Sequence, residues 1–367
     1  MKILFTLNSS NYGGMEKTVL DLIQGLGFEF EKFVVCPDGD LVKDFKVFSK
    51  VSTHNKIKSF DLNYLRFLIS FIKENNIEII HANEPRIVFH SMLAGFISGV
   101  RIRISHTHTP ISMWQIPLYK KILNILLNSL IVNLLSTKEI ALTPSIRKQK
   151  IKELTLPGKL VIIPNCLDSN FISQIDSYKT PKKTILSKYK LDGKYIFLYL
   201  SRLTKEKNQK LLIEAFYNFS KNNDSSVLIL AGKGPDYEFL KKRISAINME
   251  KRIFILNEVS ETDKIDLYMT SNCFVFPSLA EGFGITLLEA MYSCYPVISS
   301  NLEVLKEVSG NKVMFFKNNN QKSLASKLKE VIKLKDSSNK LIENKKFVLT
   351  NYTTERYIEN YESLYKH

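Results

Sequence analysis

Two carboxylates lie eight residues apart near the C-terminal end of the chain, in the segment Glu281-Gly-Phe-Gly-Ile-Thr-Leu-Leu-Glu289. An apolar run precedes this segment and another follows it, which predicts a strand, a glycine turn, a short helix and a second strand. Glycine lets backbone N–H groups approach a ligand closely, and a helix N-terminus favours phosphate. Carboxylates accept hydrogen bonds from hydroxyls. The combination therefore suggests a site for a sugar nucleotide.

A second group of charges, Ser201-Arg-Leu-Thr-Lys-Glu-Lys207, follows the predicted strand at residues 195–200. Arg202 and Lys207 flank a strand-to-helix loop in this prediction. A guanidinium fork and an ammonium suit a diphosphate, because each charge-assisted hydrogen bond contributes roughly 1.5–3 kcal/mol. A solvated run of charges is the alternative, and the acidic pair further along the chain favours the phosphate site.

Glycine pairs follow two other predicted strands. Gly13 and Gly14 come after the first strand and open a helix, while Gly232 and Gly234 come after the strand that ends at Ala231. Each pair can bring backbone amides to a phosphate at the carboxyl end of a strand. The first pair is not GxGxxG, so the dinucleotide fingerprint is absent. Plain tight turns are the alternative for both pairs.

Two histidines, His106 and His108, follow the predicted strand at residues 101–105. Either could hydrogen-bond a substrate hydroxyl or act as a base, and a satisfied loop histidine is the alternative. Metal binding is poorly supported, because no carboxylate or cysteine lies nearby at ligand spacing. The pair Asp38-Gly-Asp40 follows a proline, which favours a surface turn over a metal site. We therefore expect no metal.

Apolar, β-rich runs alternate with amphipathic stretches along the chain. Nearly continuous apolar strands between helices indicate a parallel sheet covered on both faces. The alternation breaks at the polar, lysine-rich residues 168–194 and then starts again. The predicted strands are 2–7, 32–36, 77–81, 101–105, 140–142 and 160–163, then 195–200, 227–231, 253–256, 273–276, 297–299 and 313–316. The predicted helices are 15–26, 62–74, 86–97, 211–219, 237–246, 261–269 and 354–365.

This pattern predicts an α/β protein of two Rossmann-like domains joined near residues 168–190. The 367 residues give room for two domains of ordinary size. We assign residues 1–178 to an N-terminal domain and residues 179–351 to a C-terminal domain. The tail at residues 352–367 contains an amphipathic helix, and the residues alone leave open which domain it packs against.

The net charge and the cysteines limit which partners and which compartment we expect. The chain has 52 Lys and Arg against 36 Asp and Glu, a net charge of +16. Both halves carry the excess, which is weaker evidence for nucleic acid than a focused patch, so we expect no nucleic-acid partner. The excess of positive charge has three alternative explanations. They are attraction to anionic lipid, attraction to phosphate-bearing substrates, and a proteome rich in Lys, Asn and Ile. Four scattered cysteines indicate a reduced, cytosolic protein, and we see no signal peptide.

The most apolar stretch, residues 122–135, is short and is interrupted by Asn124, Asn128 and Asn133. These interruptions argue against a transmembrane helix. Lys120 and Lys121 precede the stretch, so a membrane-surface helix is one interpretation. A helix packed in the interior is the interpretation we favour from sequence, and a peripheral membrane contact stays open.

Together these landmarks resemble the retaining family-4 glycosyltransferases of the two-domain GT-B type, especially the bacterial capsule and exopolysaccharide group. The likeness runs from Gly13-Gly14-Met-Glu16 to the final helix. Its most specific part is the run FVFPSLAEGFGITLLEA, which contains Glu281 and Glu289, and Ile163-Pro-Asn-Cys-Leu-Asp168 adds support. The resemblance implies two Rossmann-like domains facing across a cleft, with the last helix crossing back to the first domain.

The resemblance also implies roles for the charged residues. Arg202 and Lys207 would grip the donor diphosphate, Glu289 would bind the ribose, and Glu281 would hold the transferred sugar. His106 matches the family's histidine best, with His108 as its rival. The implied catalytic set is His106, Arg202, Lys207 and Glu281. The implied donor-binding set is Gly14, Arg202, Lys207, Gly232, Gly234, Glu281, Gly282, Phe283, Gly284 and Glu289, with Gly13, His108, Ile285 and Thr286 as further candidates.

Two positions depart from the family's pattern. Cys294 and Asn257 stand where the family usually has glycine. Asparagine tolerates a left-handed backbone, and cysteine does so less well. We therefore expect local strain or an altered turn at Cys294.

The implied activity is metal-independent transfer of a hexose or N-acetylhexosamine from a nucleotide diphosphate sugar, with uridine as the expected nucleoside and no cofactor. The expected acceptor is a glycan or a lipid-linked sugar of a surface polysaccharide, and the expected location is the cytoplasm, with the inner face of the membrane open. A sugar-nucleotide 2-epimerase of the same fold is the nearest alternative. A non-catalytic donor-binding subunit of a transferase pair is the alternative from another class.

Overall fold

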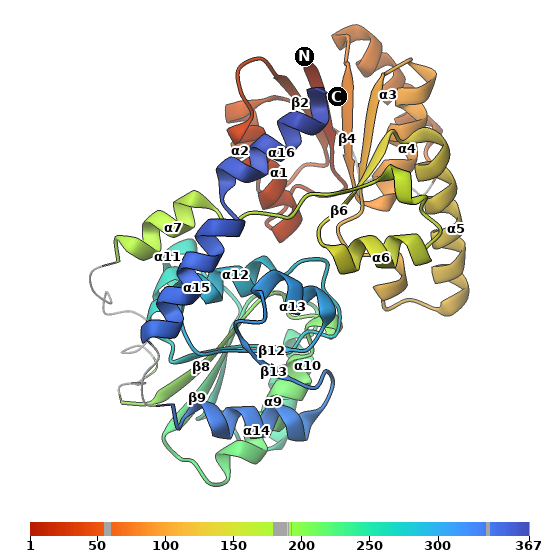
Figure 1. The fold of residues 1–367 in the computed structure, drawn as a ribbon. Coiled ribbons are helices and arrows are strands. Elements are labelled where there is room, and N and C mark those ends of the chain that lie inside the picture. Colours follow the sequence, from red (N-terminus) through yellow and green to blue (C-terminus); the bar gives the residue numbers. More distant parts are fainter. Residues whose placement is uncertain (55–59, 179–188, 190, 192, 335–337, 367) are drawn as a thin grey trace. The chain divides into compact units, whose positions relative to one another are not determined.

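A computed structural model of the chain describes all residues except 55–59, 179–188, 190, 192, 335–337 and 367. The chain divides into two compact units, which are coloured along the sequence in Figure 1. The first unit comprises Met1–Cys166 and Thr354–His367, and the second comprises Leu167–Thr353.

The first unit is built on a seven-stranded sheet with the order β3-β2-β1-β4-β5-β6-β7. All neighbouring strands are parallel. Because parallel strands place their carboxyl ends at one edge, the loops that follow β1, β4 and β5 leave the sheet on the same side. The strands are β1 (Lys2–Thr6), β2 (Glu31–Cys36), β3 (Lys50–Thr53), β4 (Ile79–Asn83), β5 (Ile102–His106), β6 (Lys138–Ala141) and β7 (Leu160–Ile162).

Helices cover both faces of the first sheet, with one apolar core on each face. Alternate strand residues point to opposite faces, so Ile3 and Phe5 enter one core while Leu4 enters the other. The first core is closed by α1 (Gly14–Gly25), α2 (Val42–Phe48) and α16 (Thr354–Lys366). The second core is closed mainly by α3 (Leu62–Asn75) and α4 (Pro85–Ile97).

The C-terminal helix α16 belongs to the first unit, where it lies beside α1 (Figure 1). Tyr361 and Tyr365 are fully buried in the first core. The Tyr357 hydroxyl donates to the Thr18 carbonyl at 3.2 Å, and the Tyr365 hydroxyl is 2.7 Å from Nδ1 of His81. These contacts satisfy the buried hydroxyls of Tyr357 and Tyr365, which would be costly without partners, so the tail is part of the core.

The second unit repeats the architecture with a six-stranded parallel sheet of order β10-β9-β8-β11-β12-β13. One face packs on α9 (Gln209–Ser220), α10 (Tyr237–Ala246) and α14 (Gln321–Val331). The strands are β8 (Tyr195–Leu200), β9 (Ser226–Ala231), β10 (Ile253–Leu256), β11 (Cys273–Phe276), β12 (Val297–Ser300) and β13 (Met314–Phe316). Among the described residues of this unit, the other α-helices are α7 (Ser169–Asp176), α11 (Glu261–Thr270), α12 (Ile285–Ser293), α13 (Glu303–Ser309) and α15 (Ser338–Asn351).

The units divide at residues 166/167, earlier than the boundary at 178/179 that the sequence suggested. The polar stretch expected to be a linker contains helix α7, which packs on the second unit. Phe171 meets Tyr268 edge to face at 5.7 Å, and the Tyr292 hydroxyl donates to Asp176 at 2.7 Å. Most of the expected linker beyond α7 falls on residues 179–188, which lie outside the described residues.

The two departures from the family's glycines cause no backbone strain. Cys294 ends α12 in an extended conformation with φ −141° and ψ 155°, and it is buried. Asn257 is not among the described residues that have positive φ. The expected strain at Cys294 is therefore absent, because the chain leaves α12 without entering the left-handed region.

The apolar segment preceded by Lys120 and Lys121 is not an interior helix, contrary to our expectation. It forms α5 (Leu118–Leu135), of which only Ser129 and Val132 are buried. Among the described residues, α5 is the one helix long and apolar enough to cross a membrane, with mean hydropathy 1.3 and 11% of its length buried. Length and composition alone are weak evidence for a span, because core helices of water-soluble proteins pass the same test.

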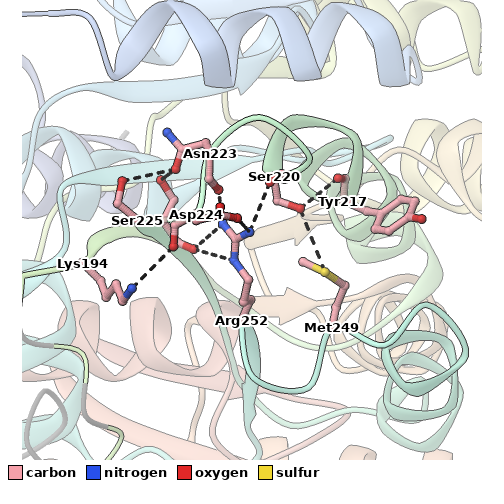
Figure 2. Close-up of polar contacts among 9 residues, drawn as sticks. Lys194, Tyr217, Ser220, Asn223, Asp224, Ser225, Met249 and Arg252 are labelled. Atoms are coloured by element: carbon pink, nitrogen blue, oxygen red, sulfur yellow. Dashed lines mark hydrogen bonds and ion pairs between the residues drawn. The ribbon is translucent and has the colours of Figure 1, made fainter.

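Arg252 ties together the turn between α9 and β9, as Figure 2 shows. Its guanidinium donates to the Ser226 carbonyl at 2.9 and 3.1 Å, to the Ser220 carbonyl at 3.2 Å, and to the Asn223 carbonyl. Asp224 lies 3.4 Å from the same guanidinium. This fork occupies the amino ends of β9 and β10, which is the sheet edge opposite the loops discussed below. Its role is therefore structural.

Arg252→Lys should lower stability while leaving the opposite edge of the sheet intact. A lysine keeps one charge but cannot reach several carbonyls at once, so we expect a loss of about 2 kcal/mol in the free energy of unfolding. Urea denaturation of the variant beside the wild type measures this loss. An unchanged midpoint would show that water replaces the guanidinium at no cost.

Candidate functional site

The loops after β8 and β11 leave the second sheet at its topological switch point. β8 is followed in sequence by its neighbour β9, whereas its other neighbour is β11, so the connections diverge on the two sides of this strand pair. Crevices at such points bind ligands in open α/β sheets. Arg202 and Lys207 follow β8, and Glu281 follows β11, so all three expected residues lie at this edge.

Lys207 and Glu281 meet in an ion pair at this edge. The Lys207 Nζ lies 2.5 Å from Glu281 Oε1, and both side chains are largely buried. Lys207 also lies over the Phe276 ring, 5.5 Å from its centroid. A backbone hydrogen bond of 2.8 Å from Leu279 to Glu206 ties the two loops beside the pair. The structure thus brings together two residues that are 74 positions apart in sequence.

The backbone of Arg202 is held by hydrogen bonds, whereas its side chain is mostly exposed to solvent. Its carbonyl accepts from the Tyr199 hydroxyl at 2.9 Å and from Gln209 Nε2 at 2.7 Å, and both partners are buried. Its guanidinium is 69% exposed and lies 3.7 Å from Glu206, an exposed pair that contributes little to stability. The guanidinium is therefore available to an anionic ligand. Gln209 and Tyr199 were missed from sequence, because nothing in their spacing indicates the carbonyl that they bind.

Gly232 and Gly234 serve the same loop by allowing close backbone approach. A Cβ on Gly232 would lie 2.1 Å from the Ser201 carbonyl oxygen, and one on Gly234 would lie 2.1 Å from the Leu203 carbonyl oxygen. Gly232 also has φ +140°. Leu203 donates to the Lys233 carbonyl at 2.8 Å, which ties the two loops together. These glycines are therefore required for packing of the Arg202 loop, whatever contact they make with a ligand.

The glycine turn between the two carboxylates folds into the start of α12. Gly284 is the N-cap of this helix with φ +100°, and a Cβ there would lie 2.9 Å from Leu305. Gly282 is buried, and the Phe283 ring is buried against Tyr352 at 5.7 Å. Ile285 and Thr286, in the first turn, are half-buried. The segment therefore presents a helix N-terminus beside Glu281, as a phosphate or sugar site requires.

Glu289 lies within α12 and is held by two partners from α11. Lys264 Nζ lies 2.6 Å from Glu289 Oε1, and the Tyr268 hydroxyl donates to Oε2 at 2.9 Å. Burial acts to lower the pKa of Lys264. The negative charges of Glu289 and Glu261 together have the opposite and larger effect, so the pKa is raised overall. Burial, followed by Glu289, raises the pKa of Tyr268. Lys264 and Tyr268 were missed from sequence, because they lie 25 and 21 residues before Glu289.

Buried polar atoms without a partner gather in the loops that carry the ion pair. Within the described part of the chain, these include Thr204 Oγ1, Asn208 Nδ2 and Ser278 Oγ. Thr204 and Asn208 flank the short helix that contains Lys207, and Ser278 lies three residues before Glu281. Such atoms are costly unless a ligand or water binds them. They support a polar ligand at this edge.

In the first unit, Gly13 and Gly14 open α1 as expected from the sequence. Gly13 is the N-cap with an extended backbone, and α1 begins at Gly14. The Glu16 side chain folds back onto Gly13, so that a Cβ there would lie 2.3 Å from its carboxylate oxygen. A carboxylate therefore already occupies this positive helix end, where a phosphate would otherwise be favoured. The turn at Asp38 and Asp40 is exposed on the surface.

His106 and His108 lie at the carboxyl end of β5 in a stack of buried aromatic rings. Their ring centroids are 3.7 Å apart, and His81 lies 5.7 Å from His106. His106 is 1% exposed and its Nε2 has no partner, whereas His108 is 8% exposed and its Nε2 is 3.1 Å from Asn83. Burial lowers the pKa of His81 and of His108 to about 3, and it lowers the pKa of His106 well below its usual value. Both candidates are thus neutral rings, and His108 is the one closer to solvent.

Gly234→Ala should destabilise the second unit through the loop that carries Arg202. The added Cβ would meet a backbone carbonyl, which cannot rotate away, so we expect a loss of about 1–3 kcal/mol in the free energy of unfolding. Thermal unfolding measures it. Gly158→Ala, where a Cβ meets nothing within 4 Å, is the matched control and should leave the melting temperature in place. Equal melting temperatures for both variants would contradict the packing role.

The buried histidines predict a pH dependence of stability. The unfolded chain protonates them below pH 6.5, whereas folding keeps His81 and His108 neutral down to about pH 3. Their contribution is thus complete above pH 6.5 and is lost as the pH falls from 6.5 toward 3, by up to about 1.4 kcal/mol per pH unit for each ring.

The measurement is urea unfolding between about pH 7 and about pH 5. His81→Gln should lower the slope of stability against pH in this window. Tyr365→Phe, which removes the hydroxyl partner of His81 without removing a titrating ring, should keep the slope of the wild type. Equal slopes for His81→Gln and the wild type would show that His81 takes up a proton in the folded protein as readily as in the unfolded chain.

Comparison with known proteins identifies the family. The model of Glycosyltransferase Family 4 matches residues 12–171, and the model of Glycosyl transferases group 1 matches residues 181–347. The capsular polysaccharide biosynthesis glycosyltransferase CapH of Staphylococcus aureus is 27% identical over 352 residues, covering 91% of this chain and 92% of CapH. The O-antigen chain mannosyltransferase RfbU of Salmonella typhimurium is 29% identical over 177 residues, covering 43% of this chain and 50% of RfbU.

Solved structures show the same fold. HepE from Anabaena, in complex with UDP and glucose, has a TM-score of 0.82 at 18% identity, with 99% of this chain and 98% of HepE covered. A glycosyltransferase from Rickettsia africae has a TM-score of 0.83 at 19% identity, with 100% of this chain and 97% of that chain covered. With one family model on each half, the protein belongs to the two-domain GT-B glycosyltransferases, and its first unit carries the family-4 domain.

Proposed function

We propose that the protein transfers a hexose or N-acetylhexosamine from a uridine diphosphate sugar to a glycan or lipid-linked acceptor, with retention at the anomeric carbon. The product would be a surface polysaccharide or a glycolipid. CapH and RfbU carry capsule and O-antigen names, and HepE was solved with UDP, which supports both the pathway class and the donor.

The observation that carries the proposal is the Lys207–Glu281 pair beside the N-terminus of α12. A cation, an exposed guanidinium at Arg202 and free backbone amides suit a diphosphate, while the two carboxylates suit hydroxyls. Glu281 would hold the transferred sugar and Glu289 the ribose. In this proposal the second unit would supply partners for the diphosphate, the ribose and the transferred sugar.

The transfer step needs a stabilised leaving group and no protein nucleophile. The acceptor oxygen bonds to the anomeric carbon from the leaving-group face, while the bond from that carbon to the phosphate oxygen breaks. The nucleoside diphosphate leaves with the electron pair, and one of its phosphate oxygens takes the acceptor's proton. Arg202, Lys207 and the amides of α12 stabilise the charge that develops on the diphosphate, so the proposed reaction is metal-independent.

A panel of nucleotide sugars tests the donor. We expect UDP and one UDP-sugar to raise the melting temperature, because a ligand that binds only the folded state stabilises it. The best donor then enters transfer assays with glycan and lipid-linked acceptors, and NMR of the product reports the anomeric configuration. Lack of stabilisation by every nucleoside diphosphate, or an inverted product, would contradict the proposal. Conversion of the donor without acceptor would indicate an epimerase.

Substitutions in the second unit test the assigned roles. Lys207→Ala should lower kcat/KM for the donor by about a hundredfold or more, because the leaving diphosphate loses its cation. Lys210→Ala, an exposed lysine next along the chain, is the control. Glu289→Gln should raise the KM for the donor and leave binding of inorganic phosphate nearly unchanged. Normal turnover in Lys207→Ala would exclude its phosphate role.

A further inference from the structure

Helix α5 exposes a continuous apolar stripe on the first unit. Its members recur at spacings of four residues in two adjacent rows, so they share one helical face. Each is between 40% and 70% exposed, while the three asparagines of the helix are only partly exposed. The stripe consists of Leu118, Tyr119, Ile122, Leu123, Leu126, Leu127, Leu130 and Leu134.

The loop after α6 (Pro144–Lys152) extends this apolar surface. Asn133 of α5 donates from Nδ2 to the Leu154 carbonyl at 2.9 Å and accepts from the Leu156 backbone at 2.9 Å. Leu154 and Leu156 are each more than half exposed. Leu154 also has φ +68°, a left-handed backbone that glycine or asparagine usually occupies after a helix. An exposed leucine is thus held at a position that disfavours it.

The stretch of chain that contains α5 and this loop is rich in positive charge and has no exposed carboxylate of its own. Residues 85–167, all of which the structure describes, contain eleven Lys or Arg and two Glu, so this stretch holds +9 of the net charge of +16. Both carboxylates are buried: Glu139 pairs with Lys150, and Glu153 accepts from the Ser112 backbone at 2.7 Å. The cations are Arg86, Arg101, Arg103, Lys120, Lys121, Lys138, Arg147, Lys148, Lys150, Lys152 and Lys159.

Several of these cations border the apolar loop directly. Arg147 donates to the Pro157 carbonyl at 3.3 Å, and Lys138 donates to the Gly158 carbonyl at 3.1 Å. Burial, followed by the charges of Arg103 and Lys138, lowers the pKa of Lys159. Like charges are therefore crowded here, and an anionic surface would relieve their repulsion.

We propose that this face, formed by α5 and the loop at residues 153–159, docks on the surface of an anionic lipid bilayer. The leucines enter the boundary between headgroups and acyl chains, while the lysines and arginines contact lipid phosphates. The first unit is thereby held at the membrane. The inference goes beyond the proposed transfer reaction, because docking requires no donor and no turnover.

Two other arrangements fit the observations less well. At 1.5 Å per residue, the 18 residues of α5 extend about 27 Å, close to a bilayer core, but crossing it would remove Val132 from the second apolar core. Arg103, which donates from Nε to the Leu135 carbonyl at 2.6 Å, would also lose this contact. A second copy of the chain would bring two crowded sets of cations together across a symmetric interface.

Vesicle co-sedimentation of the full chain tests the proposal. The wild type should bind vesicles that contain phosphatidylglycerol about tenfold or more tightly than vesicles of phosphatidylcholine alone, and added salt should weaken this binding. The triple variant Leu123→Gln, Leu126→Gln and Leu130→Gln should lose most of it. Since these side chains are exposed, its melting temperature and its stabilisation by UDP should match those of the wild type.

The matched control is a triple variant in the second unit, Phe239→Gln, Ile342→Gln and Leu349→Gln, whose side chains are similarly exposed. It should bind vesicles like the wild type. Three outcomes would overturn the proposal: no vesicle binding by the wild type, equal binding by the α5 variant, or a wild-type dimer in light scattering that the α5 variant converts to a monomer. The last outcome would assign the face to self-association.

Discussion

The parallel pairing of β8 with β11 is the constraint on which the proposed donor site depends. These strands are separated by more than seventy residues, yet Phe197 and Leu198 pair with Cys273 and Phe274 in register. Parallel strands end at the same edge, so the basic loop after β8 and the acidic loop after β11 have to leave the sheet together. The Lys207–Glu281 pair follows from this topology and would not form if either strand ran the other way.

The carboxylates of Glu281 and Glu289 are each paired with a lysine. Glu281 is paired with Lys207, and Glu289 is paired with Lys264 and bonded to Tyr268. A largely buried carboxylate without such a partner would be strongly disfavoured. Lysine pairing therefore lets the protein keep acids beside the proposed diphosphate site. A hydroxyl that binds either carboxylate has to share it with the resident lysine, which makes binding and lysine position interdependent.

Much of the fold was predictable from sequence, because strands buried on both faces of a parallel sheet consist of short, nearly continuous apolar runs. The predicted strands in both sheets fall on observed strands, with ends that differ by a few residues. The edge strand β3, with the sequence KVST, was missed because only one of its residues is apolar. Helix α7 was missed because its stretch is polar, although Phe171 and Ile175 are buried. Those two side chains suffice to attach it to the second unit.

The site was predictable only where its residues follow predicted strands. Arg202, Lys207 and Glu281 were placed correctly at strand ends, because strand order determines loop position. Their roles in catalysis remain proposals. Lys264 and Gln209 were not predictable, since each acts through a contact that depends on how helices pack on the sheet. The sequence likewise marked residues 122–135 as the most apolar stretch, but it did not show that solvent, rather than protein, covers most of it.

The distribution of carboxylates carries information that net charge conceals. A proteome biased toward lysine would raise the positive charge everywhere, leaving acids and bases mixed on each surface. Instead, the residues between Glu84 and Asp168 contain two carboxylates, and both are buried in hydrogen-bonded positions. The stretch of chain that contains α5 is therefore positively charged because it has few acids, and not because its lysines are unusually dense. Such depletion is expected where a surface meets a fixed array of anions, since a single exposed acid there would be repelled.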